Sequence, residues 1–447
     1  EFPRRVYTDF RGLASVLGYA KAPAKDSSGF YYQDHYVGAE GLERALDQQL
    51  RGENGLKIKE TDAKGNTISE STIAAPKHGS RIELSIDAEL TQAFYDAIAS
   101  RSEESGFRGG AGAMIDIETG ELIALTSYPS FNSQVMTDRS DQGLLRAYFA
   151  DTRQPFLNRA TAGLFTPGSI VKPFFAIAAL KENIIDPNKQ ILSTGELVVP
   201  NPYNPDQPSI FRDWKAHGWV DMRHAISVSS NVYFFQVGGG FEGQKGLGIT
   251  KLDAYAKMFG FGDKTGIGNL AETEGVIPSP AWKSERFPDD PWRLGDTYNS
   301  SIGQYGFQVT PLQMLRAVSG LATRGEMVTP TILKNQNKGP IENLEFTDQQ
   351  YQIVHEGMRL SATEGTAKAL AVDYVKYGAK TGTAELDSAK RYVNSWVMGF
   401  FPYDKPKYAF IILLEHGPYK NLYGSAGVMR VVSDWMYTNR PEYLRGE

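Results

Sequence analysis

The sequence predicts an α+β domain in which a central sheet joins segments from both ends of the chain, with a small accessory region before it. Strand-like segments occur between residues 81 and 127 and again between residues 395 and 415, and the chain between them is rich in helix patterns and Gly/Pro loops. The first 80 residues are polar and rich in turns, and 447 residues exceed the usual size of one domain. We therefore expect an accessory region at 1–80 and the main domain at 81–447.

The composition indicates a folded protein and excludes several classes of function. Hydrophobic residues make up 41% of the chain and aromatic residues 12%, which is enough for a sizeable core. The 47 basic residues are outnumbered by 52 acidic ones, and a net charge of −5 argues against a surface that coats nucleic acid. The absence of cysteine excludes disulfides, thiolate nucleophiles and zinc–cysteine sites. No apolar run of about 18 residues and no signal peptide occurs, so we expect any membrane anchor to lie outside this sequence.

The accessory region contains two predicted elements. Apolar residues at helical spacing predict one amphipathic helix over Gly41–Arg51. Residues 57–73 predict two strands joined by a turn at Lys64-Gly65-Asn66.

The main domain is predicted to begin with a strand, a helix and a hairpin. Polar and apolar residues alternate over 81–87, as in a half-buried strand, and Asp87 can cap a helix that continues to about Ser100. A glycine-rich turn is predicted at 109–112. A hairpin follows, with strands at 113–117 and 121–127 around the turn Glu118-Thr119-Gly120.

The end of the chain predicts the rest of the sheet. Ser395–Phe401 and Tyr408–Glu415 are apolar, aromatic runs separated by a short turn segment, so we expect adjacent antiparallel strands. Gly424–Tyr437 has the pattern of a closing helix.

The first candidate for chemistry is the segment Thr166-Pro167-Gly168-Ser169-Ile170-Val171-Lys172-Pro173. A Pro-Gly turn precedes Ser169, and the apolar run that follows predicts a helix whose first turn accommodates Pro173. Lys172 then lies one turn after Ser169 on the same face. A neutral lysine can take the proton of a serine nucleophile, although the same short pattern also occurs as a capping serine with a surface lysine.

The second candidate is Ser229-Ser230-Asn231, just before an apolar run. A second hydroxyl can relay a proton, and an asparagine offers a donor and an acceptor to a peptide-like substrate. A loop that caps a helix has the same pattern. A rival match at Ser130-Phe131-Asn132 precedes Ser169 in a predicted turn, and we discount it.

The third candidate is Lys380-Thr381-Gly382-Thr383, which precedes the two late strands and should lie at a sheet edge. A lysine with two hydroxyls can hold a carboxylate, and glycine lets a substrate backbone approach closely. A similar run at Lys264-Thr265-Gly266 lies in a glycine-rich stretch, lacks the second threonine and is predicted to be a loop. Neither run has the spacing of a phosphate-binding loop.

In this order the patterns S-x-x-K, S-D-N and K-T-G are the signature of penicillin-binding proteins and class A β-lactamases. The middle place of the second pattern varies among relatives, and here Ser230 fills it. The sequence resembles the class B penicillin-binding proteins, which are monofunctional peptidoglycan transpeptidases, and most of all their elongation-type branch, penicillin-binding protein 2. Further resemblance covers most of residues 4–440. It is carried by Gly38–Arg51, Ala113–Ile117, Leu122–Phe131, Asn158-Arg159-Ala160, Phe165–Gly168, Phe211–Lys215, Gly295-Asp296-Thr297, Gly303-Gln304 and Thr310–Gln313.

The resemblance implies a transpeptidase domain with a central antiparallel sheet, helices on both faces and an all-helical part, behind a truncated pedestal region. It implies that Ser169 is acylated by D-Ala-D-Ala stem peptides and by β-lactams, with Lys172 as its base. Ser229, Asn231 and Lys380 would complete the catalytic set. Thr381, Gly382 and Thr383 would bind the substrate carboxylate.

The resemblance also implies a location and partners. Family members sit on the outer face of the cytoplasmic membrane through an N-terminal helix. The expected partners are a membrane glycan polymerase and elongation-complex proteins, and no nucleic acid.

One departure concerns metal binding. Some elongation-type members resemble zinc binders through an Asp-Trp…His-Gly stretch and a cysteine in the second motif. Asp213 and His217 are present here, but Ser230 replaces the cysteine, and Asp221 and His224 are the other ligand-type residues nearby. We predict no metal and no cofactor.

Three alternatives stay open at this point. The chain could be a division-type transpeptidase, or another serine acyl-enzyme of the same fold such as a carboxypeptidase, a β-lactamase or a β-lactam sensor. It could also be a binding scaffold without activity, although every motif residue is intact.

Overall fold

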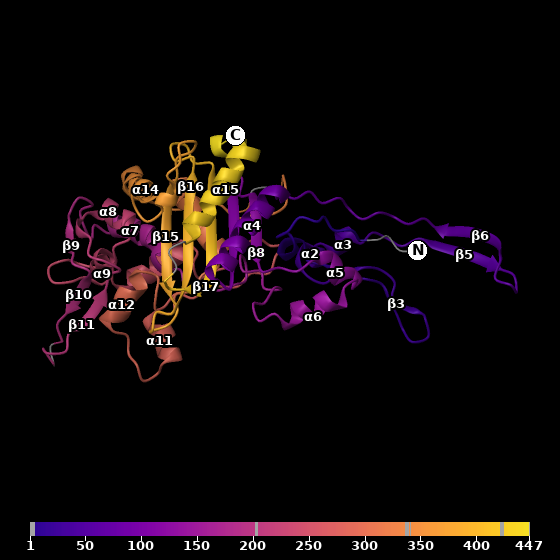
Figure 1. Cartoon of the computed structure of the whole chain (residues 1–447), viewed down its shortest axis with the longest axis horizontal. Helices are drawn as coiled ribbons and strands as arrows, with labels where there is room; N and C mark the ends of the chain where they lie inside the picture. Colours follow the sequence, from indigo (N-terminus) through magenta and orange to yellow (C-terminus); the bar gives the residue numbers. More distant parts are fainter. Residues whose placement is uncertain (1–4, 202–203, 336–338, 340, 421–423, 447) are drawn as a thin grey trace.

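A five-stranded antiparallel sheet forms the centre of the computed structural model, which describes residues 5–201, 204–335, 339, 341–420 and 424–446 (Figure 1). The strand order is β15-β16-β17-β7-β8. The strands are β7 (Gly109–Asp116), β8 (Leu122–Tyr128), β15 (Gly378–Glu385), β16 (Tyr392–Phe401) and β17 (Tyr408–Pro418). The predicted α+β fold is therefore correct, and the late strand β17 pairs with the early strand β7.

The sheet is buried on both faces. Along β17, Ile411 and Leu413 belong to one core cluster, whereas Phe410 and Ile412 belong to the other. Because successive side chains of a strand point to opposite faces, a strand covered on both sides has a continuous apolar sequence. This explains the apolar run that marked β17 in the sequence.

Helices cover the two faces of the sheet. On one face, α4 (Ala88–Ser105) packs against β7 and β8, and α15 (Ser425–Asn439) packs against α4, β16 and β17 (Figure 1). On the other face, α13 (Pro311–Ala322) packs against β17 and β7, and α14 (Asp348–Thr363) packs against β15. Asp87 caps α4 as predicted, because its Oδ1 accepts a hydrogen bond from Leu90 N at 2.9 Å.

The part predicted to be all-helical forms a lobe beside β15, and it differs from the prediction in also containing short strands (Figure 1). Its helical elements are η1 (Gly168–Val171), α7 (Lys172–Lys181), α8 (Met222–Ser227), α9 (Asn231–Gly239), α10 (Gly248–Met258), α11 (Pro280–Arg286) and α12 (Leu294–Ser301). Two small sheets accompany them, formed by β9 (Ile191–Ser193) with β12 (Gly218–Val220) and by β10 (Glu196–Val199) with β11 (Ser209–Arg212). The remaining elements of the main domain are α5 (Ser133–Asp138), α6 (Gln142–Ala150), β13 (Glu326–Met327), β14 (Glu342–Asn343), η2 (Lys368–Leu370) and α16 (Pro441–Arg445).

The N-terminal region extends away from the sheet (Figure 1). Its elements are α1 (Ala14–Leu17), β1 (Ala20–Lys21), β2 (Ala24–Lys25), β3 (Tyr31–Gln33), β4 (Val37–Gly38), α2 (Gly41–Ala45), α3 (Asp47–Leu50), β5 (Leu56–Thr61) and β6 (Thr67–Ala74). The hairpin β5–β6 confirms the predicted strand–turn–strand. The region also packs against later residues, since Ala14 shares an apolar cluster with Phe131 and Leu145. The boundary at 80/81 stays a prediction.

Two predicted helices have different bounds in the structure. The single helix predicted over Gly41–Arg51 is broken at Leu46, where φ is −112° and ψ is 18°. The break lets the carboxylate of Asp47 accept a hydrogen bond from Gly38 N at 2.9 Å, which ties the second piece to β4. The helix predicted to end near Ser100 continues to Ser105.

Two other predictions at the start of the main domain were wrong. Residues 81–87 form no strand, because their partner is an irregular segment that pairs only at Leu84 with Leu333. The glycines at 109–112 belong to β7 rather than to a turn. A Cβ on Gly112 would lie 2.7 Å from the ring of Phe94, so glycine is required where α4 packs closely on the sheet.

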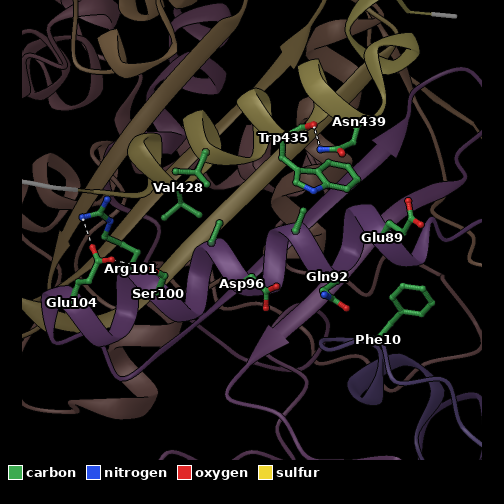
Figure 2. A pocket seen from close by; sticks show the side chains of 13 residues that line it. Phe10, Glu89, Gln92, Asp96, Ser100, Arg101, Glu104, Val428, Trp435 and Asn439 are labelled. Carbon is green, nitrogen blue, oxygen red and sulfur yellow. Dashed lines mark hydrogen bonds and ion pairs between the residues drawn. The ribbon is translucent and has the colours of Figure 1, made fainter.

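A groove of about 600 Å³ lies between α4 and α15, on the sheet face that these helices cover (Figure 2). Phe10, Val428 and Trp435 supply apolar walls, with Asp96 and Glu104 among the polar lining residues. It contains none of the predicted site residues. Among the described helices, none combines the length and the hydropathy of a bilayer-spanning segment.

Candidate active site

Ser169 lies in a tight helical turn that is pressed against the edge strand β15. Gly168 has a φ of +57° and donates its N–H to Gly303 O at 2.9 Å. A Cβ on Gly168 would lie 3.2 Å from Ala384 Cα, and one on Gly382 would lie 2.9 Å from Pro167 O. The two glycines therefore allow the first and third motifs to touch. Ser169 is half-buried, and its hydroxyl has no hydrogen-bond partner among the described residues.

Lys172 begins α7 and links the first motif to the second. Its side chain is fully buried, and Nζ donates to Asn231 Oδ1 at 2.7 Å and to Ser229 O at 2.8 Å, with Ser229 Oγ at 3.3 Å. Burial lowers the pKa of this amine to about 7, against the opposing effect of the Asp213 charge. A large fraction of Lys172 is therefore neutral near neutral pH, as a base requires.

Lys380 lies on β15, at the sheet edge that the sequence predicted. Its side chain is fully buried, and Nζ donates to Thr381 O at 2.7 Å. Burial lowers the pKa of Lys380 well below its ordinary value, and the positive charge of Lys172 lowers it further. The effect of one amine on the other indicates that the first and third motifs bring their lysines close together.

The rest of the third motif differs along the strand in exposure and contacts. Thr381 Oγ1 donates to Thr366 Oγ1 at 2.6 Å, and Thr366 N donates to Ser227 O at 3.1 Å, so Thr366 joins the third motif to the end of α8, just before the second motif. Gly382 is buried, whereas Thr383 is exposed and available to a substrate. Thr366 had no sequence signal, because it belongs to no motif and acts only as a bridge.

The second motif occupies the connection between α8 and α9. Ser229 adopts a φ of +59°, and Ser230 caps α9 by accepting a hydrogen bond from Tyr233 N at 3.3 Å. Asn231 Oδ1 faces Lys172, while its Nδ2 donates to Arg212 O at 3.3 Å. The structure thus gathers all three predicted motifs, and their catalytic roles remain predictions.

Asp213 is a further polar residue behind the second motif. Its side chain is fully buried, and Oδ2 accepts hydrogen bonds from Ser230 Oγ at 2.9 Å, Val232 N at 3.0 Å and Ser193 Oγ at 3.2 Å. Burial alone would raise the pKa of Asp213, but the nearby His217 ring, the Lys172 charge and the backbone amides hold it below its ordinary value. This carboxylate is therefore ionised in the protein interior.

The residues around Asp213 do not fit a metal. His217 Nε2 is buried without a hydrogen-bond partner and lies 3.6 Å from Asp213 Oδ1, which gives only two ligand atoms. Ser230 donates to Asp213 where a third ligand would be needed. Asp221 and His224 pair with each other instead, at 2.9 Å. Within the described ranges, no group of three or more His, Cys, Asp or Glu residues could hold a metal ion.

The two rival motifs lie outside this cluster. Lys264 is exposed, and the neighbouring Thr265 donates its N–H and hydroxyl to Glu272. In the other rival, Asn132 caps α5 by accepting a hydrogen bond from Val135 N at 3.0 Å. Both runs therefore have local structural roles.

Comparison with known families agrees with this geometry. The family model for the penicillin binding protein transpeptidase domain matches residues 110–436, and the model for the penicillin-binding protein dimerisation domain matches residues 1–84. The chain belongs to the penicillin-binding protein transpeptidase family. Its relatives place it among the class B penicillin-binding proteins, with PBP2.

One relative of this penicillin-binding protein is the peptidoglycan D,D-transpeptidase MrdA of Acinetobacter baumannii. The two are 30% identical over 97% of this chain and 66% of the relative. The chain thus spans about two thirds of the length of the curated relatives that it matches first.

Solved structures share the fold. PBP2 of Helicobacter pylori, solved in a complex with MreC, is 30% identical, with a TM-score of 0.76 over 95% of this chain and 77% of that one. A chain described under "Structural coordination of polymerization and crosslinking by a peptidoglycan synthase complex" is 26% identical, with a TM-score of 0.79 over 97% of this chain and 76% of that one.

Proposed function

We propose that this chain is a peptidoglycan D,D-transpeptidase that crosslinks stem peptides through an acyl-enzyme on Ser169. The observation that carries the proposal is the buried amine of Lys172, one turn after a half-exposed serine and within hydrogen-bond distance of Ser229 and Asn231. A nearby base of suitable pKa is what converts a serine hydroxyl into a nucleophile.

The proposed reaction has two acyl transfers. Ser169 Oγ attacks the carbonyl carbon of the penultimate D-Ala, and its proton passes to the neutral Lys172 amine. The peptide C–N bond breaks, and D-Ala leaves after its amine takes a proton delivered through Lys172 and Ser229. The amine of a second stem peptide then attacks the ester, which forms the crosslink and restores the Ser169 hydroxyl.

The third motif is assigned to substrate binding. We infer that Thr381 and Thr383 hold the terminal carboxylate of the stem peptide and that the buried Gly382 leaves room for its backbone. The buried Lys380 is assigned, with Ser229, to transfer of the proton. β-Lactams present a carboxylate and a strained amide in the same arrangement, so we expect them to acylate Ser169.

The test is labelling with a penicillin, followed by intact-mass analysis and peptide mapping. A single adduct on Ser169 that is absent from Ser169→Ala supports the proposal. An adduct that persists in Ser169→Ala would show that another residue is the nucleophile. Rapid turnover of a chromogenic β-lactam would favour a β-lactamase, and absence of any adduct would favour a binding scaffold. Release of D-Ala without an acceptor-linked product would indicate a carboxypeptidase.

We further propose a role in cell elongation, at the outer face of the cytoplasmic membrane, in the full-length protein. The likeness to MrdA, to PBP2 bound to MreC and to a peptidoglycan synthase complex supports partners that include an MreC-type protein and a glycan polymerase. Depletion of the protein should round the cells. Filamentous cells would instead indicate the division-type alternative.

A further inference from the structure

The charge of the buried Asp213 acts on Lys172 in the candidate catalytic cluster, and the proposed reaction gives Asp213 no role. It directly follows β11 and lies outside all three motifs, in the segment that precedes the second one. Its Oδ2 receives three hydrogen bonds, from Ser193 on β9, from Ser230 and from Val232. A buried carboxylate with three donors on one oxygen is held in a single orientation, because each broken bond would leave a buried polar group without a partner.

Two of these donors belong to the beginning of α9, where the second motif lies. Val232 N is one of the first helical N–H groups, which have no acceptor within a helix. Asp213 therefore acts as a second cap of α9, beside the Ser230 hydroxyl. Arg212, the residue before Asp213, also contacts this turn, because its backbone O accepts a hydrogen bond from Asn231 Nδ2 at 3.3 Å.

The turn formed by Ser229–Asn231 directs polar atoms of the second motif toward Lys172. Ser229 adopts a left-handed backbone conformation, which is unfavourable for a serine unless its surroundings impose it. In that conformation both Ser229 O and Asn231 Oδ1 lie within 2.8 Å of Lys172 Nζ. Release of the turn would therefore move all three hydrogen-bond partners of the amine.

We propose that Asp213 is a positioning residue for the acylation of Ser169, whose carboxylate fixes the Ser229–Asn231 turn against Lys172. The inference rests on the proposed function. In this proposal, hydrogen bonds from Ser193 and Ser230 hold the Asp213 carboxylate in place, as bonds to a metal ion would in a metal site.

The charge of Asp213 has a second consequence. Among the described residues, the charged group that shifts the pKa of the buried Lys172 amine is Asp213 behind the second motif, and Lys172 in turn lowers the pKa of Lys380 on β15. Asp213 raises the pKa of Lys172 and so opposes the effect of burial. Removing the negative charge should lower the pKa of Lys172 further, so that its neutral form persists at lower pH.

The experiment compares Asp213→Asn with the unchanged chain in stopped-flow acylation by a fluorescent penicillin between pH 5 and 9. We expect the second-order rate constant to fall by about tenfold or more, as when groups that orient a site ligand are removed. The midpoint of the acid limb should move down by about one pH unit. A purely structural role predicts a lower rate with an unmoved midpoint.

Two controls separate charge from position. Ser193→Ala removes one donor without changing charge, so we expect a smaller loss of rate and an unmoved midpoint. Asp87→Asn removes a carboxylate that caps α4 on the other side of the sheet, where Leu90 N donates to it at 2.9 Å. It should lower the melting temperature and leave both kinetic quantities unchanged.

Three results would overturn the inference. The first is an Asp213→Asn protein whose rate falls only in proportion to its folded fraction, with the midpoint unmoved. The second is loss of acylation when the unchanged chain is treated with EDTA and its recovery with Zn²⁺, which would assign Asp213 to a metal. The third is an unchanged chain that no penicillin acylates, which would also overturn the proposed function. An acylated chain beside an unaffected Asp213→Asn variant overturns this inference alone.

Discussion

The pKa of Lys172 leads to the sharpest test of the candidate site. Burial lowers this pKa from 10.5 to about 7. At pH 7 about half of the amines are then neutral, compared with roughly three in ten thousand for an ordinary lysine. The shift corresponds to about 5 kcal/mol and makes roughly a thousandfold more base available. The acylation rate should therefore rise with pH through a midpoint near 7.

Two substitutions of Lys172 test this reasoning. Lys172→Ala removes the base, and Lys172→Arg keeps a positive charge that no accessible pH removes. Both should lower the acylation rate constant by about 10²- to 10⁴-fold, the range for loss of a general base, and both should abolish the limb near pH 7. The assay is stopped-flow fluorescence with a labelled penicillin. A midpoint above pH 9 in the unchanged chain, or an arginine variant with near-normal rate, would refute the assignment.

Three further predictions follow from the same geometry. Lys380→Met should abolish acylation and yet raise the melting temperature, because burial of the charged amine destabilises the folded protein at every pH below the unfolded-state pKa of 10.5. The gain in stability should be largest at low pH and shrink toward pH 10.5, and calorimetry that shows destabilisation at neutral pH would contradict this prediction. Gly168→Ala should lower the free energy of unfolding by about 1–2 kcal/mol in chemical denaturation and slow acylation, since residue 168 has a φ of +57° and the new Cβ would lie 3.2 Å from Ala384 Cα. Unchanged stability would mean that the turn can relax. Lys264→Ala should change the acylation rate by less than about twofold, as an exposed loop substitution does, and a large loss would mean that the wrong K-T-G run was chosen.

The strand pattern of this fold could be predicted because its signals are local. The hairpin β7–β8 is marked by a turn between two apolar runs, and the run of β17 reflects burial on both faces of the sheet. The position of Lys380 at a sheet edge could also be predicted. Its motif precedes the two late strands, β16 and β17, which are joined by a short turn and pair with each other. Caps such as Asp87 depend on a side chain three residues from its partner, which the sequence shows directly.

The errors arose where a distant segment decides the local structure. The glycines at 109–112 resemble a turn, and only distant segments explain them within a strand: Phe94 and Ile98 of α4 approach Gly110 and Gly112, and Arg159 approaches Gly109. Residues 81–87 have the alternation of a strand, but the segment around Leu333 offers a single bridging position. The break at Leu46 depends on a bond between Asp47 and Gly38, which no periodicity reveals.

The same limit explains why Asp213 drew attention only as a possible metal ligand. Its residue type and its neighbour His217 are visible in the sequence, whereas its real partners come from β9 and from the start of α9. A carboxylate is equally suited to a metal and to a set of hydrogen-bond donors, and the choice depends on which atoms the fold brings to it. Spacing alone cannot distinguish the two.

The altered pKa of Lys172, in contrast, could have been reached from the sequence. The residues that follow it, Pro173 to Leu180, are all apolar, and a helix that is apolar on every side must lie inside the protein. A lysine in the first turn of such a helix has no path to solvent unless the helix end reaches the surface. Here the turn at Gly168 packs that end against β15, so the amine stays inside and its pKa falls. The buried helix and the buried amine are thus one feature, and a polar substitution such as Ala176→Glu should unfold the helix before it affects the chemistry.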